Sequence, residues 1–171
     1  MPRRVVITGV GALTPIGRDA EESWAAAKAG KSGISTLERL DFSQMDVRIG
    51  GEIRDFDPSQ YLERRDARRT DRFVQFAIVA AQEAMDDAGL VGADYDPDRF
   101  GAMCGTGIGG IETLTDQHRT FLERGADRVS PFFIPMMIAN MAAGQVAIRF
   151  GLRGPNTTFV TACSSSANAL G

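Results

Sequence analysis

Segments typical of strands and segments typical of helices alternate along this 171-residue chain, and this alternation restricts its fold more than any other feature. Residues 3–13 form an apolar run that alternates too little for a half-exposed strand, so they predict a buried central strand. Residues 99–104 predict a second short strand. Residues 155–161 predict a third, because they are rich in β-branched residues and follow a glycine. With helices between these strands, the pattern predicts a layered α/β fold.

The predicted helices are marked by helical spacing of apolar residues and by glycines or prolines at their ends. They cover residues 19–29, 71–88 and 110–122, and a segment that Pro135 opens and Phe150 closes. The alanines of residues 71–88 imply close packing against a neighbour. The last helix is apolar almost all round, so we expect it to be buried on more than one side, against a second subunit.

Composition excludes several classes of protein. With 43% hydrophobic and 24% charged residues the chain is typical of a globular protein, and its net charge of −3 argues against a general nucleic-acid binder. The start has no apolar signal stretch, and residues 134–148 are too short to cross a membrane, so we expect a cytoplasmic protein without a membrane partner. Two cysteines and one histidine complete neither a disulfide framework nor a metal quartet, so no metal is predicted.

Residues 155–170 pass from the predicted strand through Cys163 into small residues that can start a helix. A cysteine at a helix start faces unpaired N–H groups and the positive end of the helix dipole, which favour the reactive thiolate. The same N–H groups could stabilise an oxyanion on a thioester carbonyl. On these residues alone Cys163 is either a nucleophile on a strand-turn-helix elbow or a small buried residue, as most intracellular cysteines are.

Residues 105–110 have the glycine spacing G-x-G-x-x-G after a strand, a pattern that occurs in dinucleotide-binding turns. Such a unit needs a further strand that ends in an acidic residue about 20 residues on. Residues 123–131 are not strand-like, so no nicotinamide or flavin cofactor is predicted. We expect the glycines around Ile108 to let the backbone approach something closely, either another strand or a bound chain.

The simplest interpretation of two charged features is that they lie on the solvated surface. Arginines crowd into one short stretch of an otherwise acidic protein: Arg64, Arg65, Arg68 and Arg69. Because arginine pairs well with carboxylate or phosphate, an acidic partner is a second hypothesis for this stretch. The only imidazole, His118, stands between charged neighbours and is predicted to lie on the surface and not to serve as a base for Cys163.

Four segments together resemble the β-ketoacyl-acyl-carrier-protein synthases, most closely the elongating synthase II type. They are residues 4–11 with Thr14 and Pro15, residues 105–110, residues 130–133 with Asn140 and Met141, and residues 150–155 leading into residues 161–164. Their order and spacing match from end to end, so the resemblance covers the whole chain.

The resemblance implies a thiolase-like fold of two similar βαβαβαββ halves in αβαβα layers, and a homodimer. Residues 1–171 would be the first half, a single incomplete domain with a cap region near residues 107–150. The residues themselves predict a loop excursion around residues 32–61 with a short strand near residues 47–53. The two histidines that the family uses for decarboxylation and condensation, and its gate loop, would lie in the second half. His118 matches neither histidine.

For the reaction, the resemblance implies that Cys163 takes an acyl group from acyl carrier protein as a thioester. Malonyl carrier protein then loses CO2, and the carbanion attacks the acyl-enzyme to give a 3-oxoacyl carrier protein in fatty acid elongation. No cofactor is implied, because the substrates are carried on the phosphopantetheine of the carrier.

The family's other site residues transfer position by position. Ile108 matches a residue that lines the acyl pocket, and Phe133 matches one that reaches a pocket from the partner subunit. Basic positions that meet the acidic carrier protein are matched by Arg65, Arg68 and Arg69. Arg128 fits the same patch, although its neighbour Asp127 departs from the basic pattern.

Three alternatives stay open. The elbow also resembles that of polyketide ketosynthases, so it does not fix the substrate class. If the chain truly ends at Gly171, it would be a non-catalytic binding or dimerisation module; as the first half of a layered fold we expect it to be inactive and poorly soluble alone. A thiolase-like enzyme that uses coenzyme A would share the fold and the cysteine, but the arginine stretch favours a protein carrier.

Overall fold

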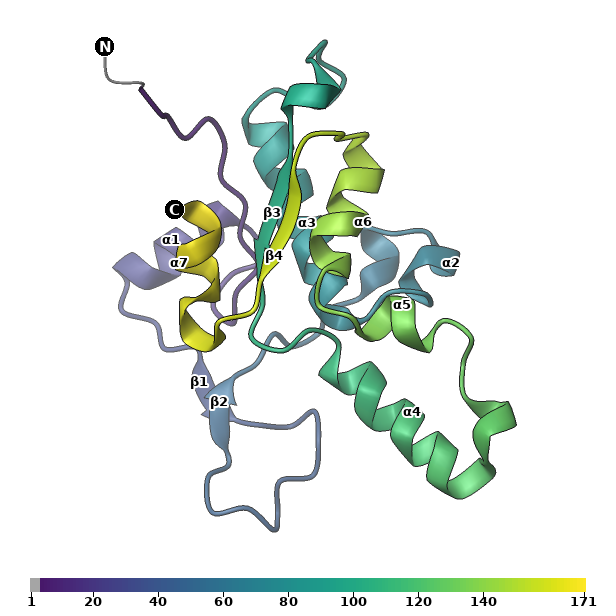
Figure 1. The fold of residues 1–171 in the computed structure, drawn as a ribbon. Coiled ribbons are helices and arrows are strands. Elements are labelled where there is room, and N and C mark those ends of the chain that lie inside the picture. The colour runs from purple at the N-terminus through teal and green to yellow at the C-terminus, as the bar shows by residue number, and fades with distance from the viewer. Residues whose placement is uncertain (1–3) are drawn as a thin grey trace. The chain divides into compact units, whose positions relative to one another are not determined.

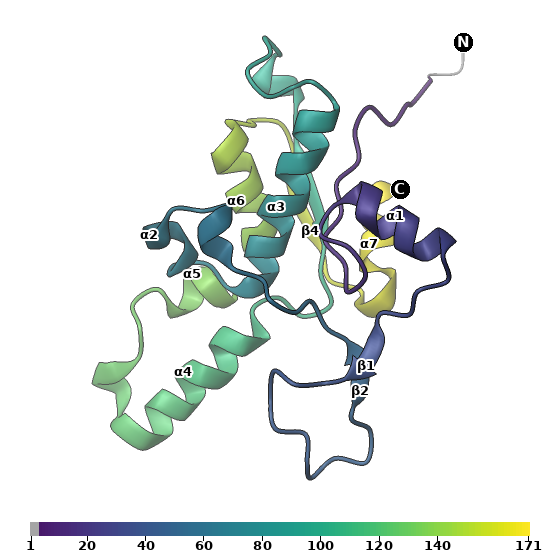
Figure 2. The same cartoon turned by 180° about the vertical axis from the view of Figure 1, so that it is seen from behind.

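The computed structural model describes residues 4–171, so Arg3, where the predicted first strand begins, lies outside the described residues. The described chain divides into two compact units, which are treated separately below. Unit 1 comprises residues 4–57 and 79–93, and unit 2 comprises residues 58–78 and 94–171. Figures 1 and 2 show the ribbon from opposite sides.

In unit 1 the first regular element is the helix α1, Ala20–Lys28. The Asp19 carboxylate accepts the Glu22 N–H at 2.7 Å and so caps the helix, and Gly30 takes a left-handed φ of 68° just after its end. The predicted helix over residues 19–29 is confirmed.

The loop excursion of unit 1 contains two short strands, β1 (Ile34–Thr36) and β2 (Ile49–Gly51), which pair antiparallel. The strand predicted near residues 47–53 is therefore confirmed as β2. The sequence did not predict β1, whose three residues are too few to show an alternating pattern.

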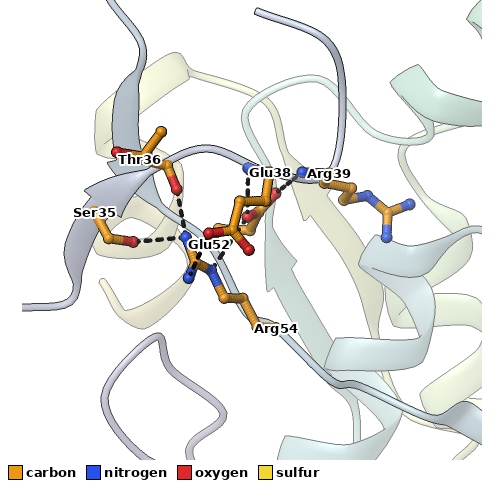
Figure 3. A network of polar contacts seen from close by, with 6 residues as sticks. All are labelled: Ser35, Thr36, Glu38, Arg39, Glu52 and Arg54. Atoms are coloured by element: carbon orange, nitrogen blue, oxygen red, sulfur yellow. Dashed lines mark hydrogen bonds and ion pairs between the residues drawn. The ribbon is translucent and has the colours of Figure 1, made fainter.

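A polar network joins the segments that follow β1 and β2 (Figure 3). Arg54 donates to the Ser35 hydroxyl at 3.0 Å and to the Thr36 carbonyl, and it pairs with the carboxylates of Glu38 and Glu52 at 3.2 and 3.5 Å. The Glu38 N–H that donates to Glu52 holds the pKa of this carboxyl below its usual value, and the Arg39 N–H and the Arg54 charge act in the same direction. The network therefore links β1 and the residues just after it to the residues that follow β2.

The predicted buried strand over residues 3–13 is wrong for the part that the structure describes. Residues 4–13 are irregular, and the side chains of Val5 and Ile7 are 93% and 85% exposed. No strand of the described chain lies beside them, so no ladder can form. An apolar β-branched run is therefore not sufficient for a strand.

The helix α3, Arg72–Asp87, matches the predicted helix over residues 71–88, and Gly89 follows it with a φ of 66°. Its first residues, to Ile78, belong to unit 2 and the rest to unit 1. Apolar side chains at helical spacing are buried along it: Val74, Ile78, Val79 and Met85.

Unit 2 is built on two parallel strands, β3 (Ala102–Gly105) and β4 (Asn156–Phe159), which lie side by side in both views. Helices α6 and α7 pack against both strands. The remaining helices are α2 (Arg64–Ala67), α4 (Ile111–Arg124), α5 (Phe133–Met137), α6 (Met141–Phe150) and α7 (Ser165–Leu170), with the short 3₁₀ helices η1 (Pro58–Gln60), η2 (Pro97–Arg99), η3 (Ala126–Arg128) and η4 (Ala162–Ser164).

The single helix predicted from Pro135 to Phe150 is wrong, because the structure breaks it into α5 and α6. α5 begins before the proline, and Ile138 is extended with a ψ of 138°. The break frees the Met137 carbonyl to accept the Gly110 N–H at 2.9 Å, a bond that local helix propensity cannot anticipate.

Within residues 4–171 the last predicted helix is buried along one face. α6 buries Ala142, Ala143 and Val146, whereas Ile148 is 73% exposed. The second subunit that was expected to cover it stays a prediction. Within residues 4–171 no helix is both long enough and apolar enough to cross a membrane.

Candidate active site

Cys163 lies on a tight elbow between β4 and α7, as the strand-turn-helix pattern predicts. It is the middle residue of η4 and is exposed to solvent. Ala162, just before it, has a φ of 51°, a left-handed conformation that costs a residue with a Cβ about 1–2 kcal/mol. The fold therefore holds a strained backbone next to an accessible thiol. The interpretation of Cys163 as a small buried residue is wrong.

Ser165 stabilises the elbow through the hydrogen bonds of its side chain. Its side chain is almost completely buried, with 3% of the residue exposed. Its Oγ accepts the Thr161 N–H at 2.8 Å and lies 2.7 Å from the Ala162 carbonyl oxygen and 3.0 Å from that of Thr106. One hydroxyl thus joins both sides of the turn to the end of β3. The sequence did not single it out, because Ser165 stands in a run of three serines.

The loop after β3 and the elbow after β4 leave the parallel pair at the same edge. Gly105 makes this approach possible, since a Cβ there would come within 2.4 Å of the Ser165 carbonyl carbon. The Thr106 N–H donates to the Phe159 carbonyl at 3.1 Å, and the Thr106 hydroxyl accepts the Gly109 N–H at 3.1 Å. Close backbone approach is confirmed at Gly105, Gly109 and Gly110 but not at Gly107, and the segments approached are the elbow and residues 136–139, not the strand or bound chain that was expected.

Ile108 lies in this same loop, and its side chain is 64% exposed. The structure therefore brings the loop of Ile108 and the elbow of Cys163 together through Thr106 and Ser165. After the loop comes α4, and η3 follows it in place of the strand that a dinucleotide-binding unit needs.

Asp71 fixes the other end of this loop, and the sequence did not point to it. Its buried carboxylate accepts the Thr113 N–H at 2.9 Å and the Thr113 hydroxyl at 2.6 Å. These bonds cap the first turn of α4, whose own N-cap residue, Gly110, has no side chain. A Cβ on Gly110 would lie only 3.0 Å from the Asp71 carboxylate oxygen. In the sequence Asp71 stands at the start of α3, and an aspartate in that position is expected to cap its own helix and not α4.

Phe133 is the first residue of α5 and is partly buried. α5 packs against α4, and the bond between the Met137 carbonyl and the Gly110 N–H attaches it to the loop of Ile108. The structure therefore places Phe133 on an element that adjoins this loop. Its role toward a partner subunit stays a prediction.

The arginines proposed to meet a carrier, Arg65, Arg68 and Arg69, are exposed on α2 and the turn after it. Arg69 also stacks on an aromatic ring, with its guanidinium carbon 4.3 Å from the centroid of Phe132. Arg128, at the end of η3, is exposed. The structure leaves these side chains accessible on unit 2.

The other titratable candidates do not join this site. His118 is exposed on α4, as predicted, and within the described residues no imidazole hydrogen-bonds to Cys163. Burial raises the pKa of the Cys104 thiol on β3, which makes it the less reactive of the two cysteines. Among residues 4–171 no three histidine, cysteine or acidic side chains gather as metal ligands.

A pocket in unit 1 is unrelated to these residues. It is lined by residues 13–18, by residues around Gly33 and by residues 52–56. None of the site residues predicted from the sequence is among them.

The family model and the curated relatives that match this chain agree with one another. The sequence model of the β-ketoacyl synthase N-terminal domain matches residues 2–171. The chain is 48% identical to the 3-oxoacyl-[acyl-carrier-protein] synthase 2 of Synechocystis sp. and 47% identical to that of Staphylococcus aureus. Both matches cover 99% of this chain and 41% of the relative. The chain therefore spans about two fifths of the length of the curated relatives it matches.

Two solved structures resemble the chain over 99% of its length. One is a β-ketoacyl synthase from Burkholderia phymatum, with a TM-score of 0.82, 26% identity and 42% of its own length covered. The other is a type II polyketide ketosynthase in complex with its acyl-carrier protein and bound to a hexaketide, with a TM-score of 0.83, 25% identity and 45% covered.

Proposed function

The chain belongs to the β-ketoacyl synthase family as its N-terminal domain, and on that premise we propose that it provides the acyl-accepting cysteine of a condensing enzyme of fatty acid elongation. The thiolase-like α/β fold predicted from the sequence is confirmed by the solved structures. The observation that carries the proposal is the exposed Cys163 on the strained elbow after β4.

The first step is acyl transfer to Cys163. The Cys163 thiolate attacks the thioester carbonyl of an acyl chain on phosphopantetheine, and the C=O electron pair moves to the oxygen. Collapse of this tetrahedral intermediate re-forms the carbonyl and expels the phosphopantetheine thiolate, so one thiolate is consumed and one is released. Exposure of Cys163 gives a carrier-borne thioester access to the sulfur.

The second step is condensation. A malonyl carrier protein loses CO2, and the resulting carbanion attacks the carbonyl of acyl-Cys163. The C–S bond then breaks, which releases the Cys163 thiolate and gives a 3-oxoacyl carrier protein. The groups that assist decarboxylation belong, in this proposal, to the part of the enzyme that the relatives have beyond the matched length. The described residues supply the cysteine and its backbone setting.

We assign the carrier-docking surface to Arg65, Arg68 and Arg69. The polyketide ketosynthase that resembles this chain is named as a complex with its acyl-carrier protein, which supports a carrier as the partner. Exposed guanidinium groups suit an acidic protein, because charge complementarity speeds encounter. This surface favours a protein carrier over coenzyme A.

The acyl pocket in this proposal includes Ile108, whose loop is tied to the elbow through Thr106 and Ser165. Phe133 would extend toward the pocket of a second subunit in a homodimer. The polyketide ketosynthase is the second candidate function, supported by its similar fold. Its 25% identity, against 48% for a 3-oxoacyl-[acyl-carrier-protein] synthase 2, places fatty acid elongation first.

The test uses the full-length protein encoded by the reading frame that contains residues 1–171. Acyl carrier protein loaded with a saturated acyl chain is added, and intact mass detects the acyl adduct. Cys163→Ala should abolish both the adduct and condensation with malonyl carrier protein, whereas Cys104→Ala, the matched cysteine control, should keep both.

Normal condensation by Cys163→Ala would rule out the nucleophile. Adduct formation from acyl coenzyme A at a kcat/KM equal to that from the carrier would contradict the carrier assignment. The absence of any adduct on the unaltered protein would favour a non-catalytic module.

A further inference from the structure

We propose that Ser165 is a positioning residue that aims the backbone N–H of Cys163 at the oxyanion of the acyl-transfer step. The proposal rests on the proposed acyl transfer to Cys163 and adds a role for a buried hydroxyl that touches no substrate. It follows from the hydrogen bonds that meet at the Ala162–Cys163 peptide.

The carbonyl of Ala162 is held by two groups of one residue. The Ser165 N–H donates to this oxygen, and the Ser165 Oγ lies 2.7 Å from it. In a trans peptide the C=O and the N–H point in opposite directions. Fixing the Ala162 oxygen toward Ser165 therefore turns the Cys163 N–H away from α7.

Within residues 4–171 the structure records no hydrogen bond from the N–H of Cys163 or from that of Ala162 before it. The N–H groups beyond these two are used: that of Thr161 donates to Ser165 Oγ at 2.8 Å, and that of Ser164 to the Thr161 carbonyl at 3.2 Å. Of the two unused donors, the one on Cys163 belongs to the exposed cysteine. A free N–H next to a nucleophile has the geometry of an oxyanion donor.

The hydroxyl of Ser165 also ties this peptide to a rigid neighbour. Its single proton is shared between the Ala162 carbonyl and the carbonyl of Thr106, just after β3, which lies 3.0 Å from the Oγ, and Ser165 is only 3% exposed. Ser165 therefore sets the peptide relative to the β3–β4 pair, beyond an ordinary bond from a serine to the preceding helical turn. Ala162 is held in its strained φ of 51° by the same contacts.

The chemical consequence concerns one step. When the Cys163 thiolate adds to the thioester carbonyl, the carbonyl oxygen gains a negative charge, and a preorganised N–H stabilises it until the phosphopantetheine thiolate leaves. Alkylation of the same thiolate by iodoacetamide displaces iodide at a saturated carbon and develops no oxyanion. The two reactions therefore separate the orientation of the N–H from the availability of the sulfur.

The test compares Ser165→Ala with Ser164→Ala in the full-length protein. Ser164 is the matched control, because it loses a hydroxyl that bonds only to the Thr161 carbonyl in the preceding turn, at 2.8 Å, and it is exposed. For each variant we would measure the single-turnover rate of Cys163 acylation by acyl carrier protein and the rate of Cys163 alkylation by iodoacetamide. Thermal unfolding of each variant would show whether its fold is intact.

Ser165→Ala should slow acylation by about 10- to 100-fold, part of the loss seen when an oxyanion donor is removed outright, and should change alkylation by less than about threefold. Ser164→Ala should change both rates by less than about threefold. Equal slowing of both reactions in Ser165→Ala would show a displaced sulfur and overturn the proposal, as would unchanged acylation. If Cys163 in the unaltered protein is alkylated but never acylated, the proposed function fails instead.

Discussion

Two segments of this chain that were predicted to be strands, residues 4–13 and the segment that contains β4, are held in place by different kinds of hydrogen bond. β4 pairs with β3 through a parallel backbone ladder that runs from Asn156 to Phe159. Residues 4–13 have no strand beside them within the described chain, and their backbone instead donates to carboxylates of α3: Val10 to Asp87 at 2.9 Å and Ala12 to Glu83 at 2.7 Å. Carboxylates can hold a backbone in place, but only a second backbone edge makes it a strand.

The difference extends to the side chains. α6 and α7 pack against β4, and the Asn156 side chain donates to the Ala143 carbonyl of α6 at 3.0 Å. In unit 1 glycines bring the backbone of residues 4–13 against α3, whose carboxylates accept its N–H groups, and the side chains of Val5 and Ile7 stay exposed. Close backbone approach thus positions a segment without burying its apolar side chains.

The largest effect on stability is expected when a methyl group is added at Gly11, where the backbone of residues 4–13 contacts α3. A Cβ there would lie 2.0 Å from the Ala80 carbonyl oxygen and 2.8 Å from the Ala84 nitrogen, and helix backbone cannot move aside as a side chain does. Gly11→Ala should therefore lower the free energy of unfolding by roughly 3 kcal/mol, measured by chemical denaturation of the full-length protein.

The control for this substitution is Gly107→Ala, where a Cβ would meet nothing within 4 Å. It should change stability by less than about 0.5 kcal/mol. If the two variants are equally stable, residues 4–13 do not rest on α3 as described.

A smaller effect should follow from changing the carboxylate that holds residues 4–13. Glu83 accepts two N–H groups, those of Ala12 and Ala20, each at 2.7 Å. Glu83→Gln keeps the size but turns one of these oxygens into a donor that faces another donor, so we expect a loss of about 2 kcal/mol in denaturation.

Asp87→Asn, one turn further along α3, serves as the comparison. Asp87 accepts a single N–H, that of Val10, at an exposed position. The loss should stay below about 1 kcal/mol. A ranking in which Asp87→Asn is the more damaging would show that the backbone of Ala12 is not held by Glu83.

The sequence predicts the parts of this fold that depend on neighbours along the chain. The glycines after α1 and α3 are local signals, and the structure agrees with both of them. The same holds for the elbow, because the change from β-branched to small residues around Cys163 occurs within a few positions.

The features that the sequence did not predict depend on residues that lie far apart along the chain. Asp71 caps a helix that begins 40 positions further on, at Ile111, and Ser165 bonds to a carbonyl 59 positions before it. Hydrophobic periodicity indicates which face of an element is buried, but it does not identify the polar atom that meets it. The missing strand at residues 4–13 has the same cause, since strand formation depends on a neighbouring edge that no local pattern encodes.

The smallest expected effect on stability concerns a buried hydroxyl of β4. The hydroxyl oxygen of Thr158 is buried and has no hydrogen-bond partner within the described chain, so the ladder carries an unpaired polar atom. Thr158→Val replaces this oxygen with a methyl group of similar size and removes its desolvation cost, which should raise the free energy of unfolding by up to about 1 kcal/mol. Thr157→Val, at the exposed neighbouring position, should show a smaller change. A clear loss of stability in Thr158→Val would mean that the hydroxyl has a partner in solution, and β4 would then be held by the Thr158 side chain as well as by Asn156 and the ladder.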